Sequence, residues 1–164
     1  MDIVIDLLRE QDIGELLTLQ RAAFLRDAQI YNNPFLSSLT QSLEGIRNEM
    51  SDHRRVILAA KLDGRLVGSV RALQKERTAH IGRLMTAPDL EGRGIGGSLL
   101  RAIESRLSSA VDSFELSTGN RSIANIEMYR RHGYVACAES MDDNGIEIVT
   151  MRKQAPAGGT HIHR

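Results

Sequence analysis

A glycine-rich segment at residues 88–100 constrains the fold and the chemistry of this chain more than any other part of its sequence. It reads Pro-Asp-Leu-Glu-Gly-Arg-Gly-Ile-Gly-Gly-Ser-Leu-Leu, a turn that runs directly into an amphipathic helix. Glycines at 92, 94, 96 and 97 allow the backbone to curl without Cβ clashes, so that successive N–H groups can point at one anion. The helix that follows adds the positive end of its dipole. The segment therefore predicts a site for the phosphate of a cofactor.

Hydrophobic periodicity around this segment predicts a mixed α/β domain. Asp63-Gly64, between two apolar runs, indicates an antiparallel hairpin. Asp12 begins an Asp-Ile-Gly-Glu pattern typical of a helical capping box, and Gly133 follows a helical pattern where a left-handed C-cap glycine belongs. In order, we expect a strand over 3–8, helices over 13–27 and 36–52, strands over 55–62, 65–73 and 78–86, a helix over 95–109, a strand over 114–118, a helix over 122–132, and a closing hairpin formed by strands from 134 onward and over 145–151. Residues 1–154 form one domain, and residues 155–164, which contain Pro156, Gly158 and Gly159, are expected to be a flexible tail.

Charge and cysteine content narrow the classes of function. The 164 residues carry 21 Lys plus Arg and 21 Asp plus Glu, so no net field attracts nucleic acid or an anionic membrane. A single cysteine, Cys137, excludes an intramolecular disulfide and a cysteine-based zinc site, and we expect no bound metal. No apolar run approaches the ~20 residues that cross a bilayer, and Asp2 and Asp6 interrupt the first apolar stretch. We therefore expect a cytoplasmic protein that binds neither nucleic acid nor membrane.

The glycine segment by itself is compatible with more than one ligand. Gly92-x-Gly94-x-x-Gly97 matches the dinucleotide fingerprint of Rossmann domains, with Asp112 about twenty residues further on. The context of that fingerprint is missing, because an antiparallel hairpin precedes the turn and no acidic residue ends the next strand. The sequence contains no Gly-Lys-Ser or Gly-Lys-Thr, which excludes a P-loop. Another phosphate-bearing cofactor and a glycine-rich turn without a ligand remain open.

Two further motifs accompany the glycine segment. Asn125-x-x-x-Tyr129 is followed by Arg131-His132-Gly133-Tyr134, and Leu84-Met85-Thr86 precedes Pro88. With Glu91-Gly92-Arg93-Gly94-Ile95-Gly96, these residues resemble the GNAT superfamily of N-acetyltransferases, whose pattern there is Arg/Gln-x-x-Gly-x-Gly/Ala. The resemblance spans Ile3 to about Arg152. It departs at Glu91, where the family has Arg or Gln and where a carboxylate facing a pyrophosphate would repel it.

The resemblance implies a fold, a cofactor and site residues. The fold is a central, mixed but mostly antiparallel sheet of about six or seven strands flanked by about four helices. The cofactor is acetyl-CoA, whose acetyl group passes to a primary amine by direct attack in a ternary complex. Tyr129 is the implied general acid, one helical turn from Asn125. The implied cofactor-binding residues are Leu84, Met85, Thr86, Gly92, Arg93, Gly94, Ile95, Gly96, Gly97 and Asn125.

The general base and the acceptor are less defined by the sequence. Counting back from the glycine segment, His80 falls where a histone-acetylating branch of the family has a strand glutamate, and its ordinary pKa suits proton transfer at neutral pH. The alternatives are that His80 lies on the strand surface and that Glu76, Glu115 or a water chain accepts the proton. The loop over 138–144, with Glu139, Asp142 and Asp143, would suit a cationic amine or be an ordinary solvated turn. Small-molecule and peptide amines both remain open as acceptors, and the resemblance suggests a homodimer.

A second class of function is compatible with the same fold. A non-catalytic acyl-CoA-binding sensor or regulatory module would keep the cofactor site and lose the general acid, whereas Tyr129 is present. Cys137 lacks a paired histidine signature, so it is not expected to carry the acyl group.

Overall fold

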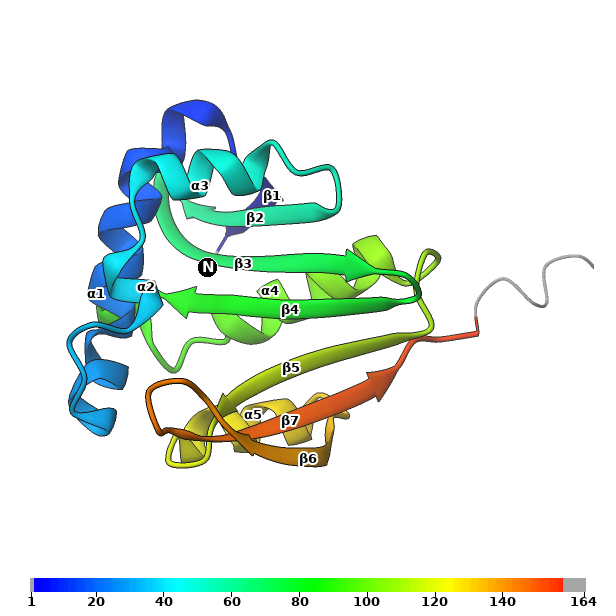
Figure 1. Cartoon of the computed structure of the whole chain (residues 1–164). Helices are drawn as coiled ribbons and strands as arrows, with labels where there is room; N and C mark the ends of the chain where they lie inside the picture. Colours follow the sequence, from blue (N-terminus) through cyan, green and yellow to red (C-terminus); the bar gives the residue numbers. More distant parts are fainter. Residues whose placement is uncertain (1, 158–164) are drawn as a thin grey trace, which may run out of the picture.

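The computed structural model describes residues 2–157 and contains one seven-stranded sheet in the order β1-β2-β3-β4-β5-β7-β6 (Figure 1). Only β4 and β5 are parallel, and every other neighbouring pair is antiparallel. The elements are β1 (Ile3–Leu7), η1 (Glu10–Asp12), α1 (Ile13–Tyr31), α2 (Ser37–Thr40), α3 (Leu43–Met50), β2 (Arg55–Leu62), β3 (Arg65–Lys75), β4 (Thr78–Thr86), η2 (Pro88–Leu90), α4 (Ile95–Leu107), β5 (Ser113–Gly119), α5 (Ile123–Arg131), β6 (Val135–Met141) and β7 (Glu147–Gln154). The expected mixed sheet with flanking helices is therefore confirmed.

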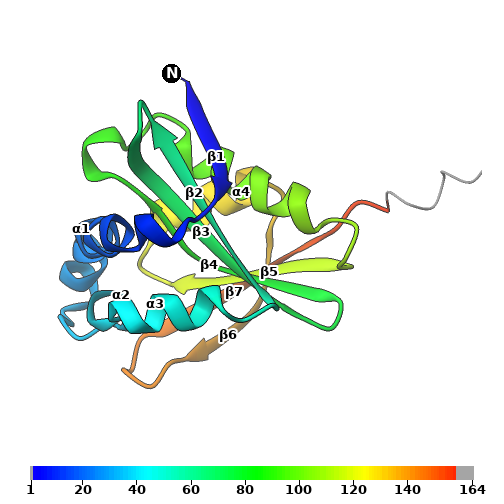
Figure 2. The same ribbon diagram turned by 90° about the horizontal axis from the view of Figure 1, so that it is seen from above.

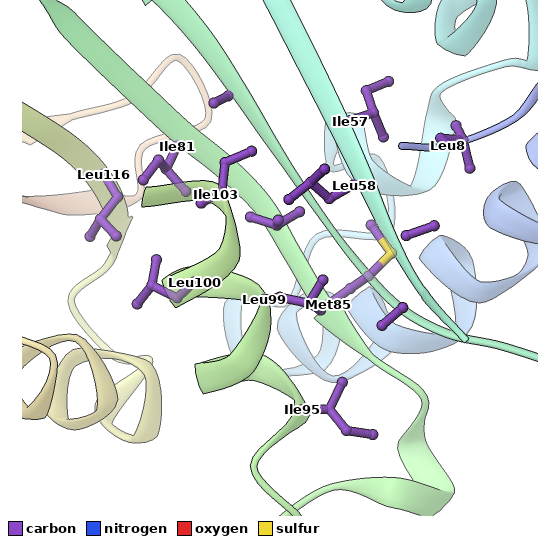
Figure 3. Close-up of a cluster of buried hydrophobic side chains, with 14 of the residues drawn as sticks. Leu8, Ile57, Leu58, Ile81, Met85, Ile95, Leu99, Leu100, Ile103 and Leu116 are labelled. Atoms are coloured by element: carbon purple, nitrogen blue, oxygen red, sulfur yellow. The ribbon is translucent and has the colours of Figure 1, made fainter. Parts of the chain in front are cut away.

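Helices cover both faces of the sheet. Seen from above, α1, α2 and α3 lie on one side of the strands and α4 lies on the other (Figure 2). The apolar stripe of α4 that the i, i+4 spacing predicts is buried, with Leu99 and Ile103 inaccessible to solvent. Figure 3 shows these side chains directed at the strands that carry Leu58 and Ile81. The core that results fixes the position of the glycine segment, because this segment leads directly into α4.

The two hairpins that the sequence predicts are present. Asp63 and Gly64 have φ of 50° and 83°, which places both residues of the β2–β3 turn in the left-handed region that this pair favours. β6 and β7 pair in antiparallel register from Val135↔Arg152 to Met141↔Glu147. Gly133, after α5, has φ of 95°, as a C-cap glycine requires.

The N-terminal helices differ from the sequence expectation. α1 continues to Tyr31, one turn beyond the expected end, and stops where Asn32 adopts φ of 50°. The capping box is not formed, because Asp12 instead pairs with Lys61 at 3.0 Å while Glu15 accepts the Leu66 amide at 2.8 Å. Both side chains thus tie α1 to the strands rather than to its own first turn.

The second expected helix is in fact two helices. The chain is extended at Gln41, and the Ser42 hydroxyl then caps α3 by accepting the Gly45 amide at 3.1 Å. Gln41 is held out of the helix because its side-chain oxygen accepts hydrogen bonds from Gln20 at 3.0 Å and from Arg71 at 2.9 Å. The three-and-four spacing of apolar residues continues across this break and therefore did not reveal it, although Ile46 is buried whereas Leu43 is exposed.

The central pair of strands separates along its length. β4 pairs with β5 only from Thr78↔Ser113 to Ile81↔Leu116. Beyond Ile81, the register of β4 against β3 shifts opposite Val70, and Arg83 adopts φ of 50°, which marks a β-bulge. Figure 1 shows the two strands close together at one end and diverging toward α1 and α2. One edge of β4 is therefore left without a strand partner at residues 82–86.

The described part of the chain ends shortly after β7. The expected tail at 155–164 lies outside the described residues from 158 onward, whereas the Ala155 amide still donates to the Asp112 carbonyl at 2.8 Å. Within residues 2–157, none of the helices combines the length and the hydropathy that a membrane span requires.

Candidate functional site

Two connected cavities open where β4 and β5 separate. A groove of about 790 Å³ runs along the glycine segment, and a smaller cavity of about 260 Å³ lies between the strands and α1. Both are lined by Phe24, Asp27, Leu84, Ser122 and Asn125, so the two spaces meet at these side chains. An elongated ligand in the groove could thus present one end to a second ligand in the smaller cavity.

The glycine segment forms one wall of the groove as the sequence predicts. Gly92 and Gly94 have φ of 78° and 83°, and a Cβ at either residue would meet no protein atom within 4 Å, so both positions face open space. Gly94 is the N-cap of α4, whose first N–H groups have no acceptor within the helix. The curl and the helix N-terminus together present backbone donors and a positive dipole end to an anion.

The last two glycines have a steric role as well. A Cβ at Gly96 would lie 3.5 Å from the Met128 sulfur, and one at Gly97 would lie 3.0 Å from His132 Nε2. Small residues at these positions let α4 and α5 approach each other while still lining the groove.

Basic side chains surround the groove. The lining includes Arg26, Arg101, Arg121, Arg131 and His132, of which Arg101 and His132 are 3.2 Å apart. Every residue that the resemblance assigns to the cofactor lines the groove except Arg93, which is exposed outside it. The cationic surroundings complement a phosphate-bearing ligand.

The acidic residue in the glycine segment has a partner that the sequence did not reveal. Glu91 Oε1 lies 3.2 Å from Arg26 Nη2 on α1, and both residues line the groove. The pair partly cancels the charge that would otherwise repel a pyrophosphate. It also places a guanidinium, supplied by another element, beside the position where the family has Arg or Gln.

The separated edge of β4 forms the opposite wall. Leu84, Met85 and Thr86 line the groove, and Met85 pairs with Ser69 of β3 on the other edge only. Because β5 has already diverged, alternate backbone groups of this segment face the groove instead of a neighbouring strand. They can therefore hydrogen-bond an extended ligand as a strand would.

Tyr129 and Asn125 lie on one face of α5, where the groove joins the smaller cavity. The Tyr129 ring is buried and its hydroxyl forms no hydrogen bond with any residue in 2–157, although it lines the cavity. Burial, with a contribution from the carboxylate of Asp27, raises the pKa of Tyr129 to about 12. The phenol is thus fully protonated at neutral pH and available to donate.

Tyr134 provides a contrast to Tyr129. Its ring centroid lies 6.1 Å from that of Tyr129, but its hydroxyl donates to Glu104 at 2.7 Å, and Glu104 also pairs with Lys153 at 2.7 Å. Tyr134 lines neither cavity. One of the two neighbouring phenols is therefore structural, and the other faces the cavity.

Asp27 on α1 is the carboxylate that the structure brings to the junction. It is half-buried, lines both cavities and forms no hydrogen bond or ion pair with a side chain in residues 2–157, and burial raises its pKa. The sequence pattern did not indicate this residue, because the helix was expected to end there and in fact continues to Tyr31. The signal that could have found it is the spacing of Phe24, Asp27 and Tyr31, which puts one carboxylate on an aromatic helix face.

The base candidates from the sequence lie elsewhere. His80 Nδ1 is 3.5 Å from Glu115 Oε1, and Arg152 pairs with the other oxygen of Glu115. Neither His80 nor Glu115 lines the groove or the smaller cavity. Glu76 lies in the β3–β4 turn, at the far end of β4 from the glycine segment. The structure therefore does not bring these three side chains to the junction.

The acidic loop near the last strands is divided between two environments. Asp142 lines the small cavity, and its Oδ1 accepts the amides of Asn144 and Ile146, both at 2.9 Å. Glu139 lies on the exposed strand β6, and Asp143 is exposed outside the cavity. Cys137 is also exposed on β6 and lines neither cavity.

Comparison with known proteins identifies the fold. A family model described as an acetyltransferase (GNAT) domain matches residues 9–155. No curated protein matches the chain in sequence. The ribosomal-protein-S18-alanine N-acetyltransferase of Escherichia coli superposes with a TM-score of 0.79 at 15% identity, over 99% of this chain and 100% of that one.

Two further solved structures show the same arrangement. PaiA N-acetyltransferase from Thermoplasma acidophilum, in complex with coenzyme A, has a TM-score of 0.77 at 20% identity, over 94% of this chain and 99% of that one. A spermidine N-acetyltransferase chimera, SpeG from Vibrio cholerae with hSSAT, has a TM-score of 0.75 at 14% identity, over 94% and 96% of the two chains. At these identities the likeness is one of fold.

Proposed function

The chain belongs to the GNAT acetyltransferase family and is an acyltransferase, and from that premise we propose that it transfers the acetyl group of acetyl-CoA to a primary amine by direct attack in a ternary complex. The observation that carries this proposal is the junction of the two cavities. A phosphate-compatible groove and a small cavity meet where Asp27 and Asn125 line both. Two ligands can therefore be in contact without a covalent enzyme intermediate.

The groove fits coenzyme A chemically. Backbone donors of Gly92 to Gly97 and the N-terminus of α4 would take the pyrophosphate, and the unpaired edge of β4 at Leu84 to Thr86 would lie along the pantetheine arm. Asn125 would hydrogen-bond the arm near its end. Bound acetyl-CoA supplies the thioester carbonyl that the amine attacks.

Proton transfer is assigned to Asp27 and Tyr129. An ammonium with an ordinary pKa of about 10.4 must lose a proton before it can attack, and a carboxylate with a raised pKa is a better acceptor than an ordinary one. Tyr129, protonated at neutral pH, would donate its proton to the departing sulfur. We therefore propose Asp27 as the base in place of His80, which lies outside both cavities.

The position of Cys137 supports direct transfer from acetyl-CoA to the amine, without an acyl-cysteine intermediate. Because it is exposed on β6 and lines neither cavity, it would not reach a thioester at the junction. A cytoplasmic location and a homodimer remain predictions. A measurement of the molecular mass in solution tests the homodimer.

The test has two parts. A thermal-shift series with acetyl-CoA, NAD and ATP should show stabilisation by acetyl-CoA alone, growing with ligand concentration above the dissociation constant. Thiol release from acetyl-CoA should then depend on an added primary amine. Stabilisation by acetyl-CoA without turnover over a broad amine panel would contradict the enzymatic proposal and favour a sensor; stabilisation by NAD or ATP instead would contradict the cofactor.

A further inference from the structure

Arg83 is an unusual arginine in this chain. It lines the small cavity and is half-buried, and burial lowers the pKa of its guanidinium. Its one side-chain hydrogen bond within residues 2–157 is donated to the Ser37 hydroxyl at 3.2 Å, and no carboxylate of the described residues forms an ion pair with it. A desolvated cation of this kind is costly unless a negative group meets it.

Arg71, on the neighbouring strand β3, is an arginine whose charge is neutralised within the protein. Arg71 on β3 is buried, lies 3.1 Å from Glu49, and donates to Gln41 at 2.9 Å as well as to Gln20. Glu49 acts on Arg83 only at longer range. Arg71 therefore has its counter-charge within the protein, and Arg83 has none in direct contact.

The backbone at Arg83 is also exceptional. Its φ of 50° lies in the left-handed region, which a non-glycine residue occupies at a cost, and it lies at the bulge where β4 leaves β5. A bulge re-aims the side chain that it carries. Here the residue so placed is a cavity-lining cation.

The same cavity is also lined by carboxylates. Asp27 has no side-chain partner within residues 2–157, lines the same cavity as Tyr129, and its charge contributes to the raised pKa of that phenol. Asp142 also lines the cavity, but one of its oxygens is already engaged by two loop amides. A single ligand in the cavity thus meets a carboxylate and a guanidinium, neither of which forms an ion pair within residues 2–157.

From this arrangement, and resting on the proposed transferase function, we propose that the acceptor is a small amine that also carries a carboxylate, an amino acid in the broad sense. Arg83 binds the carboxylate, while Asp27 holds the amine beside Tyr129. The cavity volume of about 260 Å³ is below the usual range of about 300–1,000 Å³ for drug-sized ligands, which suits an acceptor of this size. Arg83 is thus a specificity-determining residue.

Acceptors of other kinds should fit this cavity less well than an amino acid. A polyamine would bring a second cation toward Arg83, and a protein N-terminus would have its carboxylate replaced by an amide. Neither ligand would bring an anion to the half-buried guanidinium, and a site that leaves such a charge without its counter-charge discriminates against the ligand.

The experiment is a kinetic series at saturating acetyl-CoA. The acceptors are straight-chain amino acids of increasing length from glycine, each compared with its own carboxamide and with the amine that lacks the carboxylate. The preferred amino acid should exceed its carboxamide in kcat/KM on the order of 10- to 100-fold, as expected for a charge-assisted pair.

Variants at Arg83 assign the discrimination. Arg83→Gln keeps a long side chain and the same backbone conformation, so it should fold, raise KM for the amino acid to that of the carboxamide, and leave acetyl-CoA affinity unchanged. Arg83→Lys should restore part of the preference. The control is Arg77→Gln, since Arg77 is exposed and paired with Asp112 outside the cavity and should leave the preference intact.

Binding without turnover separates this proposal from the function on which it rests. Amino acid binding measured by calorimetry in the presence of CoA should require both the carboxylate and Arg83, even if no thiol is released. Such binding without any turnover would contradict the transferase proposal alone. Equal kcat/KM for an amino acid and its decarboxylated amine, or a preference unchanged in Arg83→Gln, would overturn the assignment of Arg83 while acetyl transfer stands.

Discussion

The two neighbouring tyrosines should respond in opposite ways to the loss of a hydroxyl. Tyr129 and Tyr134 are both buried and 6.1 Å apart, so Phe at either position keeps the same apolar packing. Only the hydroxyls differ in environment. That of Tyr129 faces the cavity without a partner in residues 2–157, and that of Tyr134 donates to Glu104.

The expected magnitudes follow from these partners. Tyr129→Phe removes a general acid, which typically contributes about 10²- to 10⁴-fold in kcat, or roughly 2.7–5.5 kcal/mol of barrier. It breaks no hydrogen bond within the described residues, so the free energy of unfolding should hardly change. Tyr134→Phe removes a hydrogen bond to a charged acceptor, worth about 1.5–3 kcal/mol. Since Glu104 keeps Lys153, the lower end applies, and Tm should fall by roughly 3–6 °C.

The assay combines thiol release under saturating acetyl-CoA and amine with thermal unfolding of the same samples. Tyr129→Phe should lose kcat, keep its affinity for CoA and melt with the wild-type protein, whereas Tyr134→Phe should lose Tm and keep kcat when measured well below its melting temperature. A Tyr129→Phe enzyme with kcat within about threefold of wild type would refute the assignment of the acid, since that is below the usual contribution. Equal loss of kcat in both variants would show that the aromatic cluster, rather than one hydroxyl, is what matters.

The remaining predictions concern the groove and the junction. Glu91→Gln should tighten CoA binding and Arg26→Gln should weaken it, each by up to about fivefold at low salt, because an exposed charge interaction is worth about 0.2–1 kcal/mol and both side chains line the groove. Calorimetry that gives both variants the same sign would contradict this. Gly94→Val should abolish CoA binding with the fold intact, and Gly64→Val, with the same φ of 83° in the β2–β3 turn, should cost similar stability and keep binding. Asp27→Asn should lower kcat and raise Tm at pH 7, because it removes a half-buried charge that forms no ion pair within residues 2–157. Its folded pKa is raised, so the carboxylate costs stability above that pKa and nothing below the ordinary Asp value; the gain in Tm should vanish as pH falls toward 4, and a gain independent of pH would exclude this cause.

Much of the cofactor groove could be predicted from the sequence because its determinants are local. Gly92 and Gly94 adopt the positive φ that a glycine-rich turn requires, and Asn125 and Tyr129 share a helix face because they are four residues apart. The proposed base, Asp27, could not be found in the same way. His80 was suggested by counting along one strand, whereas the carboxylate at the junction comes from α1, more than fifty positions earlier in the chain.

The sequence by itself determined the order of elements, the β2–β3 and β6–β7 hairpins and the glycine-rich turn before α4, since each depends on residues within a few positions of one another. Tertiary structure alone decided where β4 leaves β5, which carboxylate of α1 lines the same cavity as Tyr129, and that Arg26 lies against Glu91. The break after Ser37–Thr40 belongs with these, because Gln41 is drawn out of the helix by partners on α1 and β3. The physical reason is the same in each case. The interaction energy of a charged or hydrogen-bonding group depends on the partners that folding brings close to it, and the local sequence does not reveal which partners those are.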